Sequence, residues 1–162
     1  MQAVPTRERE RLMDAYLAAW NSGDPDAVAA FFAVDAVYDD RGAAEKAPGR
    51  GAIRAHLAAV MAAFPDLRFE IVRNAHVGDV SWGEWRAAMT HRGNLFGLAA
   101  TGRRIGSAGV DVARLGDDGL ITELISYYDG AAMMRDLGLL PRRGSRLERA
   151  LLRAASLPRR RS

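Results

Sequence analysis

The segment AVYDDRGAAEKAPGRGAIRAHL, residues 36–57, joins an apolar run to a helix-like pattern through two adjacent aspartates and a glycine-rich lead. Successive side chains of a strand face opposite sides of a sheet, so Asp39 and Asp40 face opposite ways. An aspartate at a strand end either bonds the backbone of a turn or places a carboxylate at the mouth of a pocket. Both interpretations of Asp40 predict a strand that ends here.

The pattern on either side of this segment predicts helices. Apolar residues recur at helical spacing over residues 6–22. Asp24 followed by Pro25 is typical of a helix start, and we expect this second helix to run through Phe32. Apolar residues over 53–64 predict a third helix with one apolar face.

The pattern changes after Pro65. The runs LRFEIVRNAHV, VSWGEWRAAMTHRG, RIGSAGVDVARL and LITELISYYD read as strands separated by turns, and GAAMMRDLGLLP reads as a short helix. Helices followed by strands predict an α+β fold, in which a curved antiparallel sheet wraps around the three N-terminal helices and encloses a pocket.

The pairing of the last two strands decides which acids share a face. If Leu115 lies opposite Leu120 across the GDDG turn, a regular ladder places Asp111 opposite Leu124. Asp129 then faces away, and a one-residue bulge would bring it round.

The charge divides the chain into two parts. Residues 142–162 hold eight arginines and one acid, whereas the other 141 residues hold 15 basic and 19 acidic residues. We therefore expect a domain over 1–141 and a basic extension over 142–162, composed of a short helix and a disordered tail. The extension could contact nucleic acid, an anionic surface or the acidic body without specificity. It has no aromatic residue on which bases could stack.

Composition excludes several kinds of site. The chain has no cysteine, which rules out disulfides and thiolate nucleophiles. Its three histidines form no pair at helical ligand spacing, so we expect no metal site. No apolar run approaches the roughly 20 residues needed to cross a bilayer, and the N-terminal residues hold no apolar signal core. These features predict a cytoplasmic protein without a membrane partner.

Several blocks, in one order, resemble a known superfamily. YLAAWNSGDPDAVAAFFAVDAVYDD, GRGAIRAHL and GVDVARLGDDGLITEL are similar to ketosteroid isomerase-like members of the nuclear transport factor 2-like superfamily. THRGNLFGLAATGRRI and YYDGAAMMRDLGLLP resemble the SnoaL-like polyketide cyclases. The resemblance covers about residues 6–141. It implies a cone-shaped fold, a homodimer, and a cofactor-independent acid/base enzyme that cyclises or isomerises a small hydrophobic carbonyl compound.

Both reactions take a proton from a carbon next to a carbonyl, and negative charge grows on the oxygen. They need a base within hydrogen-bond reach of that carbon and donors near the oxygen. The resemblance assigns the base to Asp40 and the donors to Tyr16 and Asp111. In the SnoaL-like pattern, Asp129 is the general acid/base and His91 binds or orients the substrate.

Each of these residues also has a structural interpretation. Tyr16 could be a core tyrosine, Asp111 the partner of a nearby arginine, Asp129 the cap of the helix that follows it, and His91 an ordinary polar residue at a strand end. Four large side chains could line a pocket for a flat apolar ligand or could simply fill the core: Trp82, Trp85, Met89 and Phe96.

Two other functions compete with cyclisation or isomerisation. Epoxide hydrolysis, as in the limonene epoxide hydrolase-like branch of this fold, requires an arginine two residues before the first aspartate. Gly109 stands there before Asp111, which counts against this function. A non-catalytic binding or dimerisation module would fill its cavity with apolar side chains. The candidate acids and Tyr16 favour an enzyme over such a module.

Overall fold

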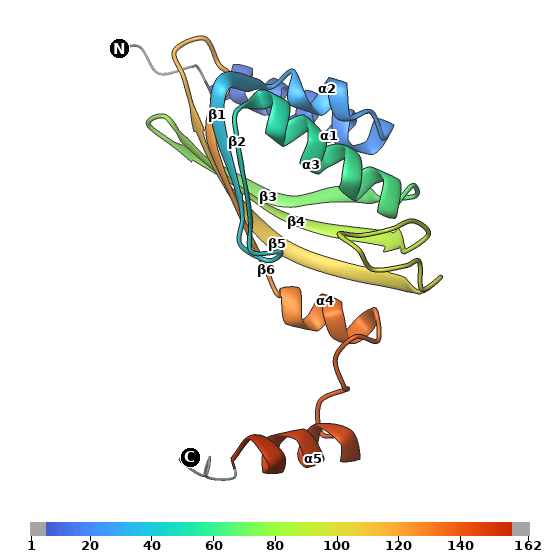
Figure 1. The fold of residues 1–162 in the computed structure, drawn as a ribbon. Coiled ribbons are helices and arrows are strands. Elements are labelled where there is room, and N and C mark those ends of the chain that lie inside the picture. Colours follow the sequence, from blue (N-terminus) through green and yellow to red (C-terminus); the bar gives the residue numbers. More distant parts are fainter. Residues whose placement is uncertain (1–5, 157–162) are drawn as a thin grey trace, which may run out of the picture.

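The computed structural model describes residues 6–156, in which a curved sheet wraps around helices on its concave side (Figure 1). The predicted α+β class and cone shape are confirmed. Its helices and strands, in chain order, are α1 (Thr6–Ser22), α2 (Pro25–Ala29), β1 (Phe32–Asp40), β2 (Glu45–Pro48), α3 (Arg50–Ala63), β3 (Arg68–Val77), β4 (Val80–Thr90), β5 (Arg104–Leu115), β6 (Ile121–Tyr128), α4 (Gly130–Asp136) and α5 (Arg146–Ala155).

The two N-terminal helices begin where the sequence predicted, but the second ends early. Asp24 caps α2 by accepting a hydrogen bond from the Asp26 amide, and Pro25 occupies the first turn. The prediction that α2 runs through Phe32 is wrong. Phe32 begins β1 and pairs with Ile121 of β6, because an available sheet partner outweighs the helical spacing of the side chains.

The opening segment of the sequence folds as a hairpin followed by a helix. β1 ends at Asp40, as predicted, and turns into β2, a strand that the sequence pattern did not predict. The turn uses the left-handed backbone of Ala44, whose φ is 57°. Gly49 then adopts a φ of 83° and leads directly into α3. The aspartates and glycines therefore shape a reversal of the chain at the rim of the sheet.

The strand order is β2-β1-β6-β5-β4-β3, which places the first strands beside the last one. The neighbouring pairs are antiparallel except β1 and β6, which run parallel. The sequence predicted a curved antiparallel sheet, and the parallel pairing of β1 with β6 is a correction to that prediction. A parallel pair requires a long connection, and here the connection runs through α3 and four further strands, β2, β3, β4 and β5.

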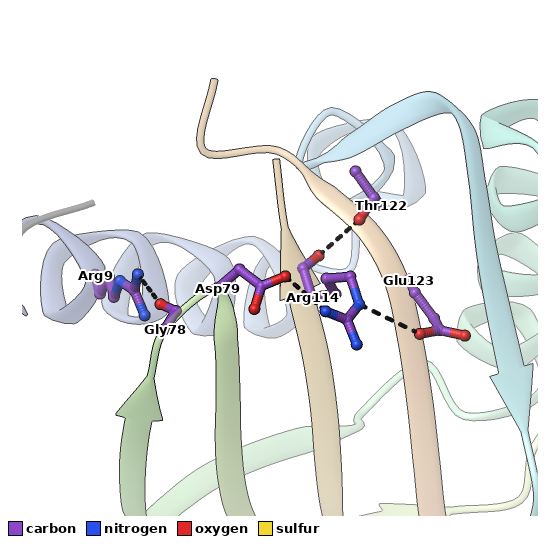
Figure 2. Close-up of polar contacts among 6 residues, drawn as sticks. All are labelled: Arg9, Gly78, Asp79, Arg114, Thr122 and Glu123. Atoms are coloured by element: carbon purple, nitrogen blue, oxygen red, sulfur yellow. Dashed lines mark hydrogen bonds and ion pairs between the residues drawn. The ribbon is translucent and has the colours of Figure 1, made fainter. Parts of the chain in front are cut away.

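The pairing of β5 with β6 contains a bulge at Thr122. Leu115 pairs with Ile121 and Arg114 pairs with Glu123, which leaves Thr122 without a partner residue. The Thr122 hydroxyl donates a hydrogen bond to the carbonyl oxygen of Arg114 at 3.2 Å (Figure 2). The pairing of Leu115 with Leu120, one of the alternatives that the sequence left open, does not occur, because the turn is one residue longer and the bulge adds another.

Charged side chains hold this end of the sheet in place. The Arg114 guanidinium lies 2.6 Å from Asp79 in the β3–β4 turn and 3.9 Å from Glu123 on β6 (Figure 2). The Arg9 guanidinium of α1 donates to the carbonyl oxygen of Gly78 in the same turn. These contacts connect α1 and three strands at the end of the sheet where β6 begins.

The core lies between the helices and the concave face of the sheet. Its fully buried large side chains come from β1, α3, β6 and the residues after α3 and α4: Phe32, Ile53, Leu57, Phe64, Leu124 and Leu137. No helix of the described residues is long and apolar enough to cross a membrane.

The C-terminal extension contains one helix that stands apart from the cone (Figure 1). Ser145 caps α5 through the Glu148 amide, and Leu147, Leu151 and Leu152 are exposed on its surface. The predicted disordered tail after this helix falls on residues 157–162, which lie outside the described part of the chain. The boundary between domain and extension remains a prediction.

Candidate active site

The cone holds a cavity of about 420 Å³, within the range of pockets that bury a drug-sized ligand. Its wall is mostly apolar and comes from α1, α3, α4 and the concave face of the sheet. Six of the predicted site residues line it: Tyr16, Asp40, Trp85, Met89, Phe96 and Asp111. A small number of polar groups in an apolar wall is the usual composition of a binding site for a small organic molecule.

Two acids and one serine form a row across the sheet. Ser126 of β6 pairs with Asp40 of β1 on one side and with Asp111 of β5 on the other. Paired residues of adjacent strands project to the same face, and neighbouring strands lie about 4.8 Å apart. The backbones of Asp40 and Asp111 are therefore separated by about 10 Å. All three side chains line the cavity.

Asp111 is held by two donors at one carboxylate oxygen. The Trp85 indole nitrogen lies 2.8 Å from Oδ1, and the Ser126 hydroxyl lies 2.6 Å from the same oxygen. Among the described residues, none donates a hydrogen bond to Oδ2. Within residues 6–156, no arginine contacts Asp111, which argues against that structural interpretation. One oxygen fixes the orientation of the carboxylate and the other is left for a ligand.

Burial raises the pKa of Asp111 to about 6 from an ordinary value of 3.8. The Ser126 and Trp85 hydrogen bonds oppose this rise, and the nearby Asp40 carboxylate adds to it. At pH 7 about nine in ten Asp111 side chains are therefore ionised. A carboxylate with a pKa close to neutrality is a better base than an ordinary aspartate.

Two tyrosines surround this carboxylate. The Tyr38 hydroxyl lies 3.1 Å from the Ser126 hydroxyl. Because Ser126 donates its proton to Asp111, Tyr38 is the donor in this pair. The Tyr16 hydroxyl is buried and has no hydrogen-bond partner among the described residues. Burial and the Asp111 charge raise the pKa of both tyrosines, which keeps their protons in place.

Asp40 is occupied by neighbouring groups. Its Oδ1 accepts a hydrogen bond from the Ala43 amide at 3.0 Å, and its Oδ2 lies 3.3 Å from Nε2 of His56 on α3. Both side chains are about 8% exposed. The Asp40 charge and a hydrogen bond to Asp40 also help to raise the pKa of the Tyr128 hydroxyl, which is raised mainly by burial. The turn and pocket interpretations of Asp40 therefore both describe its surroundings.

Glycine at 109 makes room for the Trp85 ring. A Cβ atom at this position would lie 2.6 Å from Cζ2 of Trp85 and would collide with the Tyr127 carbonyl. Gly109 pairs with Trp85 across β4 and β5, so the indole lies over the glycine and reaches Asp111. An arginine at 109, as epoxide hydrolysis would require, has no space here.

Three predicted residues are not among the described residues that line the cavity: Trp82, His91 and Asp129. Trp82 is an odd number of residues from Trp85 in one strand, so it lies on the other face. Asp129 is exposed and caps α4 by accepting from the Ala132 amide at 2.8 Å. His91 is fully buried, and its Nδ1 lies 3.1 Å from the Thr101 hydroxyl.

Sequence reasoning did not assign several polar residues of the cavity wall. They include Tyr38, His56, Ser126 and Tyr128. Ser126 and Tyr128 lie two and four residues after Leu124 in β6, so they share its face of the sheet. The period of two would have identified them once the register was known. His56 lies between Ile53 and Val60 at helical spacing, which was a usable signal for an inward position.

Within the part of the chain that the structure describes, no group of three or more histidine or acidic side chains is placed to hold a metal ion. A family model for SnoaL-like polyketide cyclases matches residues 10–137. The chain belongs to the SnoaL-like polyketide cyclase family. No curated protein matches it.

Solved structures with the same fold include bacterial relatives of this family. AclR from Streptomyces galilaeus, described as a candidate hydroxylase, has 23% identity and a TM-score of 0.74 over 93% of this chain and 94% of its own. IdmH from Streptomyces antibioticus, described as a candidate polyketide cyclase, has 27% identity and a TM-score of 0.65 over 80% of this chain and 97% of its own. A Jannaschia protein described as a candidate SnoaL-like cyclase has 19% identity and a TM-score of 0.74 over 87% of this chain and 99% of its own.

Proposed function

We propose that this SnoaL-like family member is a cofactor-independent acid/base enzyme that cyclises or isomerises a hydrophobic carbonyl compound. The observation that carries the proposal is Asp111, a partly buried carboxylate in the wall of an apolar cavity, with one oxygen fixed by two donors and the other without a donor among the described residues. In this proposal Asp111 removes the proton next to the carbonyl. Its pKa of about 6 leaves it ionised at neutral pH and strong enough to accept that proton.

The assignment of the base differs from the one that the family resemblance implied. Asp40 was expected in this role, but its two oxygens contact the Ala43 amide and His56. Asp111 was expected to donate a proton, but a group with a pKa of about 6 is mostly an acceptor at pH 7. The role of base therefore moves from Asp40 to Asp111 because of the different surroundings of the two carboxylates.

A ring-closing probe tests the proposal. A suitable probe is a β-keto ester with an ortho-acetylphenyl group on its terminal carbon, because proton loss and attack on the acetyl carbonyl close a six-membered ring. Asp111→Asn should lower the enzymatic rate by about 10²-fold or more, since it removes the base. The rate is followed by the absorbance of the aromatic product, after subtraction of the rate in buffer.

Asp129→Asn is the matched control. It removes the same charge at an exposed cap outside the cavity wall, so we expect the rate to stay within a factor of two. Equal rates for Asp111→Asn and the unmodified protein would contradict the proposed base. A protein that binds the probe but never exceeds the rate in buffer would be a binding module instead.

A further inference from the structure

His56 is a second polar group of the cavity whose surroundings suggest a task. Its ring lies between two aromatic side chains: Phe96 stacks on it at 5.7 Å between centroids, and Tyr38 meets it edge-on at 5.3 Å. Its Nε2 lies 3.3 Å from Oδ2 of Asp40. Two rings and one carboxylate therefore fix the imidazole in one orientation, and it lines the cavity.

Both carboxylate oxygens of Asp40 contact neighbouring groups: Oδ1 accepts from the Ala43 amide, and Oδ2 faces Nε2 of His56. Asp40 therefore orients the imidazole ring. When the pair is ionic, Nε2–H faces Asp40 and the imidazolium carries a second N–H at Nδ1. Among the described residues, none accepts a hydrogen bond from Nδ1. A histidine oriented by a carboxylate on one nitrogen can pass a proton through the other. The His56–Asp40 pair can therefore act as a proton donor through Nδ1.

The position of this pair complements that of the base. Asp40 and Asp111 lie at the two ends of the row that passes through Ser126, about 10 Å apart. A substrate that extends along the row would present an acidic carbon to Asp111 and a second carbonyl group to His56. The cavity therefore suits a molecule in which both groups belong to one flexible chain.

We propose that His56, held by Asp40, donates a proton to the oxygen of the accepting carbonyl group when the ring closes. This proposal rests on the proposed function and restricts it to aldol-type cyclisation. The C–H bond breaks and its proton goes to Oδ2 of Asp111. The electron pair of that bond forms the new carbon–carbon bond, the carbonyl pair moves to oxygen, and the oxygen takes the proton of Nδ1. Exchange with water then restores both groups.

The test separates proton removal from bond formation. A β-keto ester without the acetylphenyl group cannot close a ring, but it exchanges its acidic hydrogen in D2O when a base removes it. His56→Gln should keep this exchange within about threefold and lower ring closure of the acetylphenyl probe by about 10²-fold. Asp40→Asn, which removes the orienting carboxylate, should give the same separation with a smaller loss of ring closure.

The matched control is Asp129→Asn. Asp129 caps α4 at an exposed position outside the cavity wall. We expect both reactions to be unchanged in this variant. Thermal unfolding of all variants distinguishes a lost proton donor from a misfolded protein.

The outcomes distinguish this inference from the proposed function. Equal losses of exchange and ring closure in His56→Gln would show that His56 supports the structure or the base, and would overturn its role as donor. Unchanged ring closure in that variant would also overturn it. Loss of exchange in Asp111→Asn supports the base independently of His56, and unchanged exchange there would overturn the proposed function itself.

Discussion

At Asp111, burial opposes ionisation while Trp85 and Ser126 favour it. The opposition has an energetic consequence, because the ionised form that the proposed reaction requires is less stable in the fold than in water. The folded pKa of about 6 lies above the ordinary value of 3.8. A raised carboxyl pKa means that the folded state holds its proton more tightly than the unfolded state. Stability from this group is therefore complete below pH 3.8 and is lost as the pH rises to about 6.

The raised pKa of Asp111 predicts that the free energy of unfolding falls as the pH rises. Between the two pKa values the free energy of unfolding should lose about 3 kcal/mol because of Asp111. Asp111→Asn, which cannot ionise, should lack this loss and should be more stable than the unmodified protein at pH 7.5. Urea unfolding of both proteins at pH 4 and pH 7.5 measures the difference. A parallel pH dependence in the two proteins would contradict the raised pKa.

At the scale of elements, β4 and β5 approach each other closely where Gly109 faces Trp85. A methyl group at 109 would lie within 2.6 Å of the indole ring. Gly109→Ala should therefore displace the ring, lower the free energy of unfolding by about 1–3 kcal/mol, and weaken the bond from Trp85 to Asp111. Chemical unfolding and the ring-closing rate measure both effects.

Gly106→Ala is the control for this substitution. Gly106 lies in the same strand, and a Cβ atom there would meet only the Ala87 carbonyl at an ordinary contact distance of 3.6 Å. We expect little change in either measurement. If Gly109→Ala were equally harmless, the indole would have room to move and the close contact would not position Asp111.

The elements also show what sequence could and could not predict. α1 matched its predicted residues, and the cap of α2 matched Asp24 and Pro25, because capping and helical spacing are local signals. β2 and the early end of α2 were missed, since both depend on partner strands that are distant in sequence. The sequence indicated a bulge between β5 and β6 only as one alternative. The bulge at Thr122 sets the register in which Asp111 pairs with Ser126.

The same limit applies to the site. Acids in strands were visible in the sequence, and Asp40 and Asp111 do line the cavity. Ser126 could not be assigned, because the neighbours of a strand residue across the sheet follow from register and not from local pattern. His56 lies on α3 and was missed although its helical spacing indicated an inward position. The period of two alone would have placed Trp82 and Trp85 on opposite faces of β4.

At the scale of the whole molecule, the basic extension contributes charge, and its described part, residues 142–156, stands apart from the cone (Figure 1). Removal of residues 142–162 should change the free energy of unfolding by no more than about 0.5 kcal/mol, since its described leucines are exposed already. The ring-closing rate should also be unchanged. The shortened protein should lose retention on a heparin column, because eight arginines are removed. A large fall in thermal stability would show that the extension covers part of the cone.

The parallel pair of β1 and β6 determines when the site can exist during synthesis. β1 leaves the ribosome early, but its partner on the Asp111 side is the last strand of the sheet. Until β6 emerges, one edge of β1 stays open, and the two acids have no serine to align them. Such distant pairing slows folding. The wall of the cavity is therefore incomplete until β6 pairs with both β1 and β5.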